Sequence, residues 1–229
     1  MTLCAAQINV PGGCLPEIIA YDADRASAYH RHHRKNLRTR ISTARERHLV
    51  ARALATLGKT EAVLDLACGT GRFWPVIDAC ASLVVAVDNS DAMLREAVAH
   101  AAPNPRRAAV CGSAFALPFR DRTFDAVICM RFLHHLAHRD DRLTALAEIR
   151  RVTRHGAIVS LWTDGSREGR RRLREQNAAH LPRGFGRRVC IARTTIERDF
   201  TDAGFSRATG FDFAPWLSMW RIYALHCAD

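Results

Sequence analysis

Residues 63–73 read VLDLACGTGRF, and this stretch decides the fold of the 229-residue chain. Its apolar run predicts a short buried strand over 62–66, the two glycines predict a tight turn, and a helix is expected from Arg72. A turn of this kind lets a ligand approach the backbone closely. A nicotinamide or flavin fingerprint would need a third glycine where Trp74 stands, and no Gly-Lys-Ser/Thr follows for a phosphate-binding loop.

Outward from this stretch, short apolar runs alternate with helical patterns. Further strands are expected over 83–87, 107–111, 124–130, 157–162, 205–213 and 217–226, and helices over 43–57, 91–102 and 140–152. Such alternation predicts a doubly wound, mostly parallel α/β sheet of seven strands. We expect one domain in three parts: a leader and N-terminal helical cap over 1–59, a cofactor-binding α/β core over 60–164, and a basic insertion with closing strands over 165–229.

The second strand is expected to end in a carboxylate, Asp88, 17 residues after Gly71. A carboxylate in this position can accept hydrogen bonds from the hydroxyl groups of a ribose. Together with a glycine turn that lacks a phosphate-binding loop, it indicates an adenosine ligand without a phosphate group.

Four motifs in order give the chain a resemblance to the class I S-adenosylmethionine-dependent methyltransferases, in the methyltransferase type 11 or ubiquinone/menaquinone-biosynthesis-like group. Residues 63–71 resemble the family's first motif, which ends in C-G-T-G. Residues 87–94, VDNSDAML, resemble V-D-x-S-x-x-M-L. Residues 111–119, CGSAFALPF, resemble G-D-A-x-x-L-P-F, and residues 121–127 match D-x-S-F-D-x-V. The resemblance implies the Rossmann-like fold, the methyltransferase activity and the cofactor S-adenosyl-L-methionine.

The resemblance also assigns cofactor-binding residues. The methionine half would be lined by Asp65, Ala67, Gly69 and Gly71, and Asp88 would bind the ribose hydroxyls.

At the adenine, the resemblance implies that Asn89 and Met93 border the ring and that Ser113 and Ala114 belong to the same slot. Many relatives carry Asp where Ser113 stands, and a hydroxyl accepts a weaker hydrogen bond than a carboxylate. We therefore expect packing to hold the adenine.

The segment after the fourth strand contains Arg131, His134 and His135. Ligands of open parallel sheets bind beyond the carboxyl ends of the strands, so these residues are expected beside the sulfonium. A histidine there can act as a base at neutral pH, or can pack against the cofactor or cap the next helix. From the cap, Tyr29 would close the pocket and Arg40 would meet the cofactor carboxylate, as in similar enzymes.

Several features exclude other classes. The cysteines form no C-x-x-C pair, and His135 and His138 lack partners at ligand spacing, so no metal site is expected. No apolar run is long enough for a transmembrane helix, and the first 16 residues do not resemble a secretory signal. The chain is therefore expected to be cytoplasmic with reduced cysteines.

The formal net charge of +11 is concentrated in two segments. Residues 25–52 carry nine basic residues and one acidic residue, residues 165–200 carry ten and four, and residues 60–164 carry twelve of each. Arginine supplies 32 of the 34 basic residues, which is compatible either with a bias of the coding sequence or with one positive surface for an anionic partner.

The function expected from these features is methyl transfer to a small, anionic acceptor such as a metabolite or a glycan or lipid intermediate. One alternative is an RNA-directed methyltransferase that holds phosphates with the two basic segments, although no aromatic-interleaved platform accompanies them. A second alternative is a non-catalytic, cofactor-binding scaffold.

Overall fold

A computed structural model describes residues 22–34, 37–178 and 188–228, so the expected leader lies almost wholly outside the described residues. The helices are α1 Ala23–Arg34, α2 Leu37–Ala55, α3 Trp74–Ile77, α4 Asp91–His100, α5 Arg139–Val152, α6 Arg167–Ala178 and α7 Arg193–Asp202. The strands are β1 Ala62–Leu66, β2 Leu83–Asp88, β3 Arg107–Cys111, β4 Phe124–Cys129, β5 Thr153–Thr163, β6 Cys190–Ile191, β7 Arg207–Asp212 and β8 Trp220–His226.

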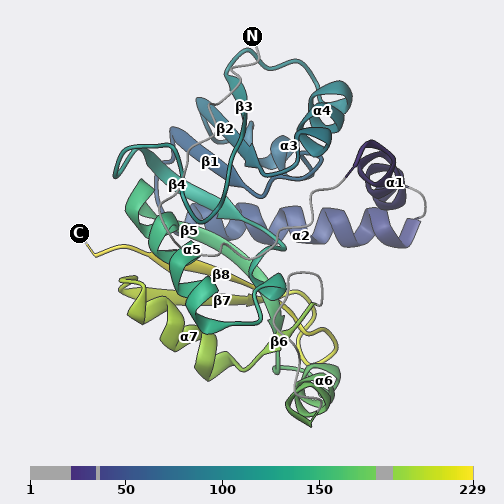
Figure 1. The fold of residues 1–229 in the computed structure, drawn as a ribbon, viewed down its shortest axis with the longest axis vertical. Coiled ribbons are helices and arrows are strands. Elements are labelled where there is room, and N and C mark those ends of the chain that lie inside the picture. The colour runs from purple at the N-terminus through teal and green to yellow at the C-terminus, as the bar shows by residue number, and fades with distance from the viewer. Residues whose placement is uncertain (1–21, 35–36, 179–187, 229) are drawn as a thin grey trace.

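One sheet runs through the described chain in the order β3-β2-β1-β4-β5-β8-β7, with helices on both faces (Figure 1). Strands β1 to β5 are parallel, and β8 is antiparallel to both β5 and β7. The short β6 pairs with the last residues of β5 and adds an eighth strand to the seven expected. The prediction of a doubly wound, mostly parallel α/β fold is confirmed.

Strand β4 shows why the sheet carries a core on each face. Successive side chains of a strand point to opposite faces. Val127 and Cys129 accordingly pack in the cluster under α5 and α7, whereas Ala126 and Ile128 pack in the cluster under α2, α3 and α4. A strand buried on both faces lacks polar alternation, which explains the continuous apolar run in the sequence.

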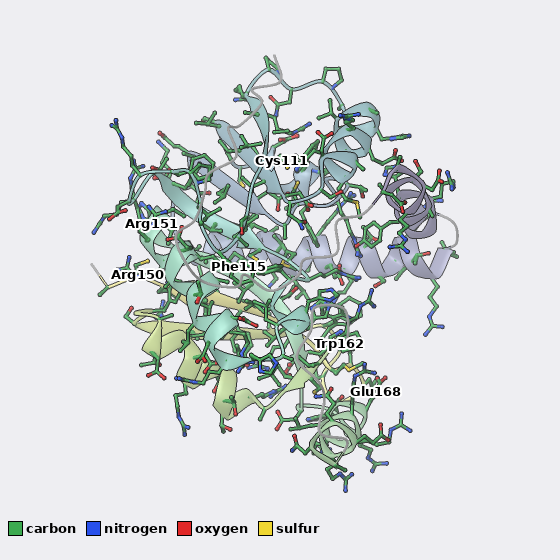
Figure 2. All side chains as sticks on the ribbon, viewed as in Figure 1. Cys111, Phe115, Arg150, Arg151, Trp162 and Glu168 are labelled. Atoms are coloured by element: carbon green, nitrogen blue, oxygen red, sulfur yellow. The ribbon has the colours of Figure 1, made fainter. Side chains whose placement is uncertain are left out.

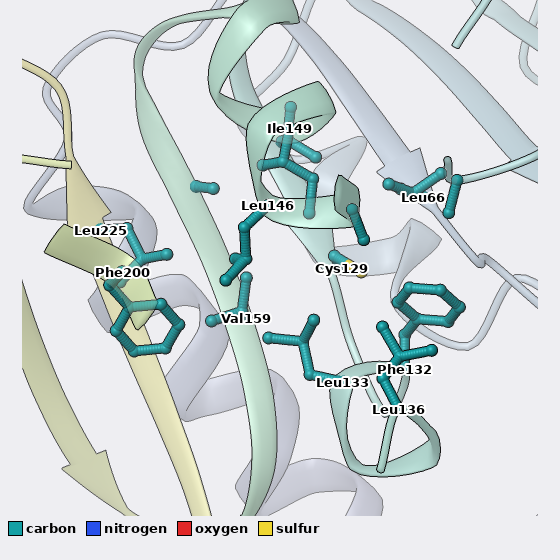
Figure 3. Packing of buried hydrophobic residues seen from close by; sticks show 14 of the residues in the cluster. Leu66, Cys129, Phe132, Leu133, Leu136, Leu146, Ile149, Val159, Phe200 and Leu225 are labelled. Atoms are coloured by element: carbon teal, nitrogen blue, oxygen red, sulfur yellow. The ribbon is translucent and has the colours of Figure 1, made fainter. Parts of the chain in front are cut away.

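The first of these clusters is built around α5. Figure 3 shows Leu146 and Ile149 of α5 above Val159 of β5, with Phe200 of α7 and Leu225 of β8 beside them. All five side chains are buried. Phe132, Leu133 and Leu136, from the segment that follows β4, belong to the same cluster, so this packing also fixes that segment.

Three helices differ from the sequence-based expectation. Helix α2 begins at Leu37, six residues before the expected start. The sequence did not predict these residues as helical, because the first two turns carry few apolar side chains. The helix expected from Arg72 is the four-residue α3. Helix α6 was not expected, because its sequence has no apolar stripe at helical spacing. In the structure its only buried residue is Gly169.

The described helices include none that is both long enough and apolar enough to cross a bilayer.

Candidate active site

A cavity of about 450 Å³ opens beyond the carboxyl ends of β1, β2 and β4. Its walls come from α1, from the glycine loop after β1, and from the segments after β2, β3 and β4. The lining residues are Arg25, Tyr29, Asp65, Leu66, Ala67, Cys68, Gly69, Thr70, Arg72, Phe73, Asp88, Asn89, Met93, Gly112, Ala114, Met130, Arg131, Phe132, His134, His135 and Arg188. Its volume falls in the usual range for a small-molecule site.

The glycine loop turns through residues in the left-handed backbone region. Ala67 has φ of 54°, Gly69 has φ of 55° and Gly71 has φ of 70°. A Cβ added at Gly69 would meet no atom within 4 Å, because this residue faces the cavity. A Cβ added at Gly71 would lie 2.7 Å from the indole of Trp74, which is 1% exposed. Gly71 therefore lets the buried Trp74 approach the loop.

Asp88 joins the glycine loop to β2. Its Oδ2 accepts a hydrogen bond from the Gly69 N–H at 2.8 Å, and its Oδ1 accepts one from the Ser90 N–H at 2.9 Å. Burial raises the pKa of Asp88, and the two N–H groups oppose this rise. Each carboxylate oxygen retains a lone pair for a further donor, so the group can still bind a ligand hydroxyl.

Asp65 lies at the end of β1 and is 1% exposed. Within the described chain, its Oδ2 has no hydrogen-bond partner. Burial raises the pKa of Asp65 to about 8. A buried carboxylate with an unpaired oxygen on the cavity wall fits a cationic donor, such as the ammonium group of an amino-acid moiety.

The adenine end predicted from the sequence is partly assembled. Asn89, Met93 and Ala114 line the cavity, with Met93 and Ala114 buried. Ser113 does not line it, because its hydroxyl accepts the Phe115 N–H at 3.2 Å within the loop that follows β3. The serine therefore serves the turn itself, which its place in the motif could not reveal.

The far end of the cavity is formed by the segment after β4. His134 is 1% exposed, and its ring lies 5.2 Å from the Trp162 ring and 5.0 Å from the Trp220 ring, centroid to centroid. Its carbonyl accepts the Val189 N–H at 2.7 Å, which brings Arg188 to this wall. Figure 2 shows Trp162 on the same side as α6 and Glu168, while Arg150 and Arg151 lie on the opposite side of the molecule.

Both histidines are neutral at physiological pH. Burial lowers the pKa of His134 well below its usual value, and the neighbouring His135 and Arg188 lower it further. Burial and the charge of Arg188 lower the pKa of His135 to about 4. A neutral imidazole can accept a proton, but at this pKa only from an acidic donor.

An ion-pair network connects α2 to the cavity and was not predicted. Glu46, buried in α2, lies 2.7 Å from Nη2 of Arg72 and 2.5 Å from Nη2 of Arg131, and both arginines line the cavity. Arg131 itself has φ of 60°, and its N–H donates to Ser160 Oγ at 2.9 Å. One signal was present in the sequence: Glu46 is the single acidic residue between positions 25 and 52.

Two of the predicted residues line a second cavity instead. Gly71 and Arg40 belong to a cavity of about 730 Å³ on the other side of the glycine loop, between α2, α3 and the end of α4. Arg40 therefore does not reach the first cavity, whereas Arg25 and Tyr29 of α1 do. Arg25, Arg72 and Arg188 are the charged lining residues that sequence reasoning missed.

The sheet and the cavity beyond its carboxyl edge define a class of protein: a Rossmann-like domain for a nucleoside cofactor. The sequence model of the methyltransferase domain family matches residues 64–161. Residues 64–161 therefore form a methyltransferase domain, and the resemblance to methyltransferases indicated by the four motifs is confirmed.

Known proteins similar to this chain differ in what their names say they methylate. A demethylmenaquinone methyltransferase of Thermobifida fusca is 38% identical over 120 residues, 51% of this chain and 50% of that protein. A tRNA (carboxymethyluridine(34)-5-O)-methyltransferase of Xenopus tropicalis is 34% identical over 112 residues, 48% of this chain and 17% of that protein. The chain spans less than two thirds of the length of these curated relatives.

The fold also matches solved structures. Magnesium protoporphyrin IX methyltransferase of Synechocystis PCC 6803, solved with bound SAH, aligns with a TM-score of 0.65 at 20% sequence identity. The alignment covers 88% of this chain and 94% of that chain. At this identity the match shows the shared fold and leaves the acceptor open.

Proposed function

We propose that the protein transfers a methyl group from S-adenosyl-L-methionine to a small, anionic acceptor, such as a carboxylated or phosphorylated metabolite, glycan or lipid intermediate. The observation that carries this proposal is the distribution of charge in the 450 Å³ cavity. The buried carboxylates Asp65 and Asp88 lie at the ends of β1 and β2, whereas Arg131 and Arg188 lie with the histidines beyond β4.

The carboxylate end suits the cofactor. S-Adenosylmethionine, when bound, supplies a methyl group on a sulfonium leaving group, so the protein mainly has to position the acceptor. Asp65 would meet the ammonium group and Asp88 the ribose hydroxyls. Met93 and Ala114 would hold the adenine by packing. Arg72, kept in place by Glu46, would face the carboxylate of the methionine moiety.

The arginine end suits the acceptor. A guanidinium group binds carboxylate or phosphate through two parallel donors, and Arg188 and Arg131 offer such donors at the cavity wall. His135 is the better placed proton acceptor, because His134 is enclosed by Trp162 and Trp220. With a pKa lowered to about 4, His135 is a weak base, so the site favours an acceptor that is already ionised, such as a carboxylate, which needs no base.

The proposal also assigns a role to each part of the chain and a cellular compartment to the enzyme. Residues 1–59 would cap the cofactor, residues 60–164 would form the core, and residues 165–229 would complete the acceptor end of the same domain. We place the enzyme in the cytoplasm, in keeping with the free cysteines of the described residues.

An RNA acceptor is the second candidate, because relatives named as tRNA methyltransferases match about half of the chain. The enclosed cavity would then have to receive a single extruded base, with the basic helices holding phosphates outside. Binding would weaken steeply with salt, since each neutralised phosphate releases counterions. A small acid bound by one or two arginines would show a shallow salt dependence.

The deciding experiment incubates the full chain with methyl-labelled cofactor and fractionated extract of the host. Label in small acidic compounds would support the proposal. Label in a fraction that ribonuclease destroys would establish the RNA acceptor instead. If calorimetry shows cofactor binding and no fraction becomes labelled, methyl transfer to these acceptors is contradicted.

A further inference from the structure

A cluster of metal-binding residue types lies outside the cofactor cavity, where α1 packs against α4. His30 comes from α1, and Glu96 and His100 come from α4. One ligand atom from each residue lies within 4.8 Å of the other two. The rings of His30 and His100 approach to 4.2 Å between centroids, so the two helices are in close contact here.

The donor set is that of a transition-metal site. Two imidazoles and one carboxylate are a common ligand set for Zn²⁺, with a water completing the tetrahedron. Metal–ligand bonds of about 2.0–2.1 Å place tetrahedral ligand atoms about 3.3 Å apart, so small rotations of partly exposed side chains would close the cluster. Glu96 and His100 are four residues apart and share one face of α4, with 3.5 Å between Glu96 Oε1 and His100 Nδ1.

The carboxylate is already oriented toward the histidines. The Ser27 hydroxyl, one turn before His30 on α1, donates to Glu96 Oε2 at 3.1 Å. Glu96 is only 15% exposed at its side chain, and no described arginine or lysine pairs with it. A neutral donor that holds the second oxygen of a ligating carboxylate is a typical supporting contact of metal sites.

We propose that His30, Glu96 and His100 form a binding site for a divalent transition-metal ion such as Zn²⁺, which fastens α1 to α4. Tyr29 precedes His30 directly, and both Tyr29 and Arg25 line the cofactor cavity. Met93, one turn from Glu96, lines the same cavity. The ion therefore holds the cap helix in the position that covers the cofactor, and takes no part in methyl transfer.

This site departs from the sequence-based expectation of no metal. The expectation rested on spacing along the chain, whereas His30 lies on a different helix, far from Glu96 in sequence. The arginines of the second cavity, which His30 and His100 also line, oppose the approach of a cation. We therefore expect affinity in the micromolar range.

Titration of the metal-free full chain with Zn²⁺, followed by calorimetry, tests the site. We expect one ion per chain in the wild type and at least a tenfold loss of affinity in both His30→Ala and His100→Ala. The matched control is His48→Ala, an exposed histidine on α2 outside the cluster, which should bind as the wild type does. Circular dichroism checks that each variant is folded, and Co²⁺ absorption reports the coordination geometry.

Hydrogen exchange tests the role of the ion without requiring methyl transfer. Zn²⁺ should slow exchange of the α1 amides in the wild type and in His48→Ala, and should leave them unchanged in His30→Ala. Unaltered Zn²⁺ affinity in His30→Ala and His100→Ala would overturn the site. Loss of binding without any effect of Zn²⁺ on α1 exchange would overturn its role in holding the cap. Either result is independent of whether the acceptor proposal is correct.

Discussion

Replacing Gly71 with Ala should destabilise the protein more than the same replacement at other glycines with positive φ. Gly71 has φ of 70°, and an alanine Cβ would lie 2.7–2.9 Å from three atoms of the Trp74 indole. Trp74 is 1% exposed and Arg107 lies 4.1 Å from its ring centroid, so moving the indole would disturb a buried contact. The variant therefore adds overpacking to backbone strain.

The magnitude follows from these two contributions. A left-handed backbone costs a non-glycine residue about 1–2 kcal/mol, and overpacking a rigid core costs about 1–3 kcal/mol. Gly71→Ala should thus lower the free energy of unfolding by about 3 kcal/mol and the Tm by about 6–12 °C. Gly58→Ala, with φ of 81° and no atom within 4 Å of the new Cβ, is the matched control. It should cost about 1 kcal/mol, or about 2–4 °C.

Gly69→Ala separates stability from cofactor binding. Its Cβ also meets no protein atom within 4 Å, but it would project into the cavity. It should match Gly58→Ala in thermal unfolding and lose cofactor affinity in calorimetry, while Gly58→Ala binds normally. Equal Tm values for Gly71→Ala and Gly58→Ala would refute the role of Trp74, and normal cofactor binding by Gly69→Ala would refute its place in the site.

Three further predictions concern charged groups. Burial raises the pKa of unliganded Asp65 to about 8, and a bound cation favours the carboxylate, so cofactor binding should release a proton. Calorimetric affinity should therefore rise with pH up to about pH 8 in the wild type but not in Asp65→Asn. Glu46→Gln should lower the free energy of unfolding in urea by about 3 kcal/mol, since it leaves the buried guanidinium of Arg72 and the partly buried guanidinium of Arg131 without their counter-charge. An unchanged midpoint would contradict this. Arg188→Ala should raise the acceptor KM at least tenfold without changing the cofactor Kd. Arg171 is exposed on α6, so Arg171→Ala should alter neither constant. Equal KM values in the two variants would show that Arg188 does not bind the acceptor.

The fold could be predicted from the sequence wherever a local pattern had one physical meaning. β1 occupies the expected residues 62–66, because an apolar run before two glycines is compatible only with a buried strand and a turn. Ser90 directly precedes the helix expected from Asp91, and it caps α4 by accepting the Met93 N–H at 3.3 Å. Asp65 and Asp88 reach one cavity because adjacent parallel strands end at the same edge of the sheet.

The remaining features depend on contacts between distant residues. Helix α6 has almost no apolar face, and is held instead by polar contacts such as Gln176 Nε2 to the Cys190 carbonyl at 3.0 Å. The threonines at 194 and 195 predict the start of a helix that ends at Gly204. In the structure α7 begins at Arg193, whose N–H donates to Asp164 Oδ1 at 3.0 Å, just after β5. Patterns along one segment contain no information about partners that the fold brings in from another.

The charge of +11 also divides into groups with different roles once the structure is considered. Most α6 arginines are exposed to solvent. Arginines in the core are neutralised by buried carboxylates; Arg142 Nε, for example, lies 2.8 Å from Asp199 Oδ2. Among the described basic residues of the two segments, only Arg25 and Arg188 line the cofactor cavity. Figure 1 shows α1 and α6 at separate places on the molecule, so the arginines of these two helices do not lie side by side. Recognition of a small anion would then depend on the few guanidinium groups that face the cavity, and the total charge would say little about the acceptor.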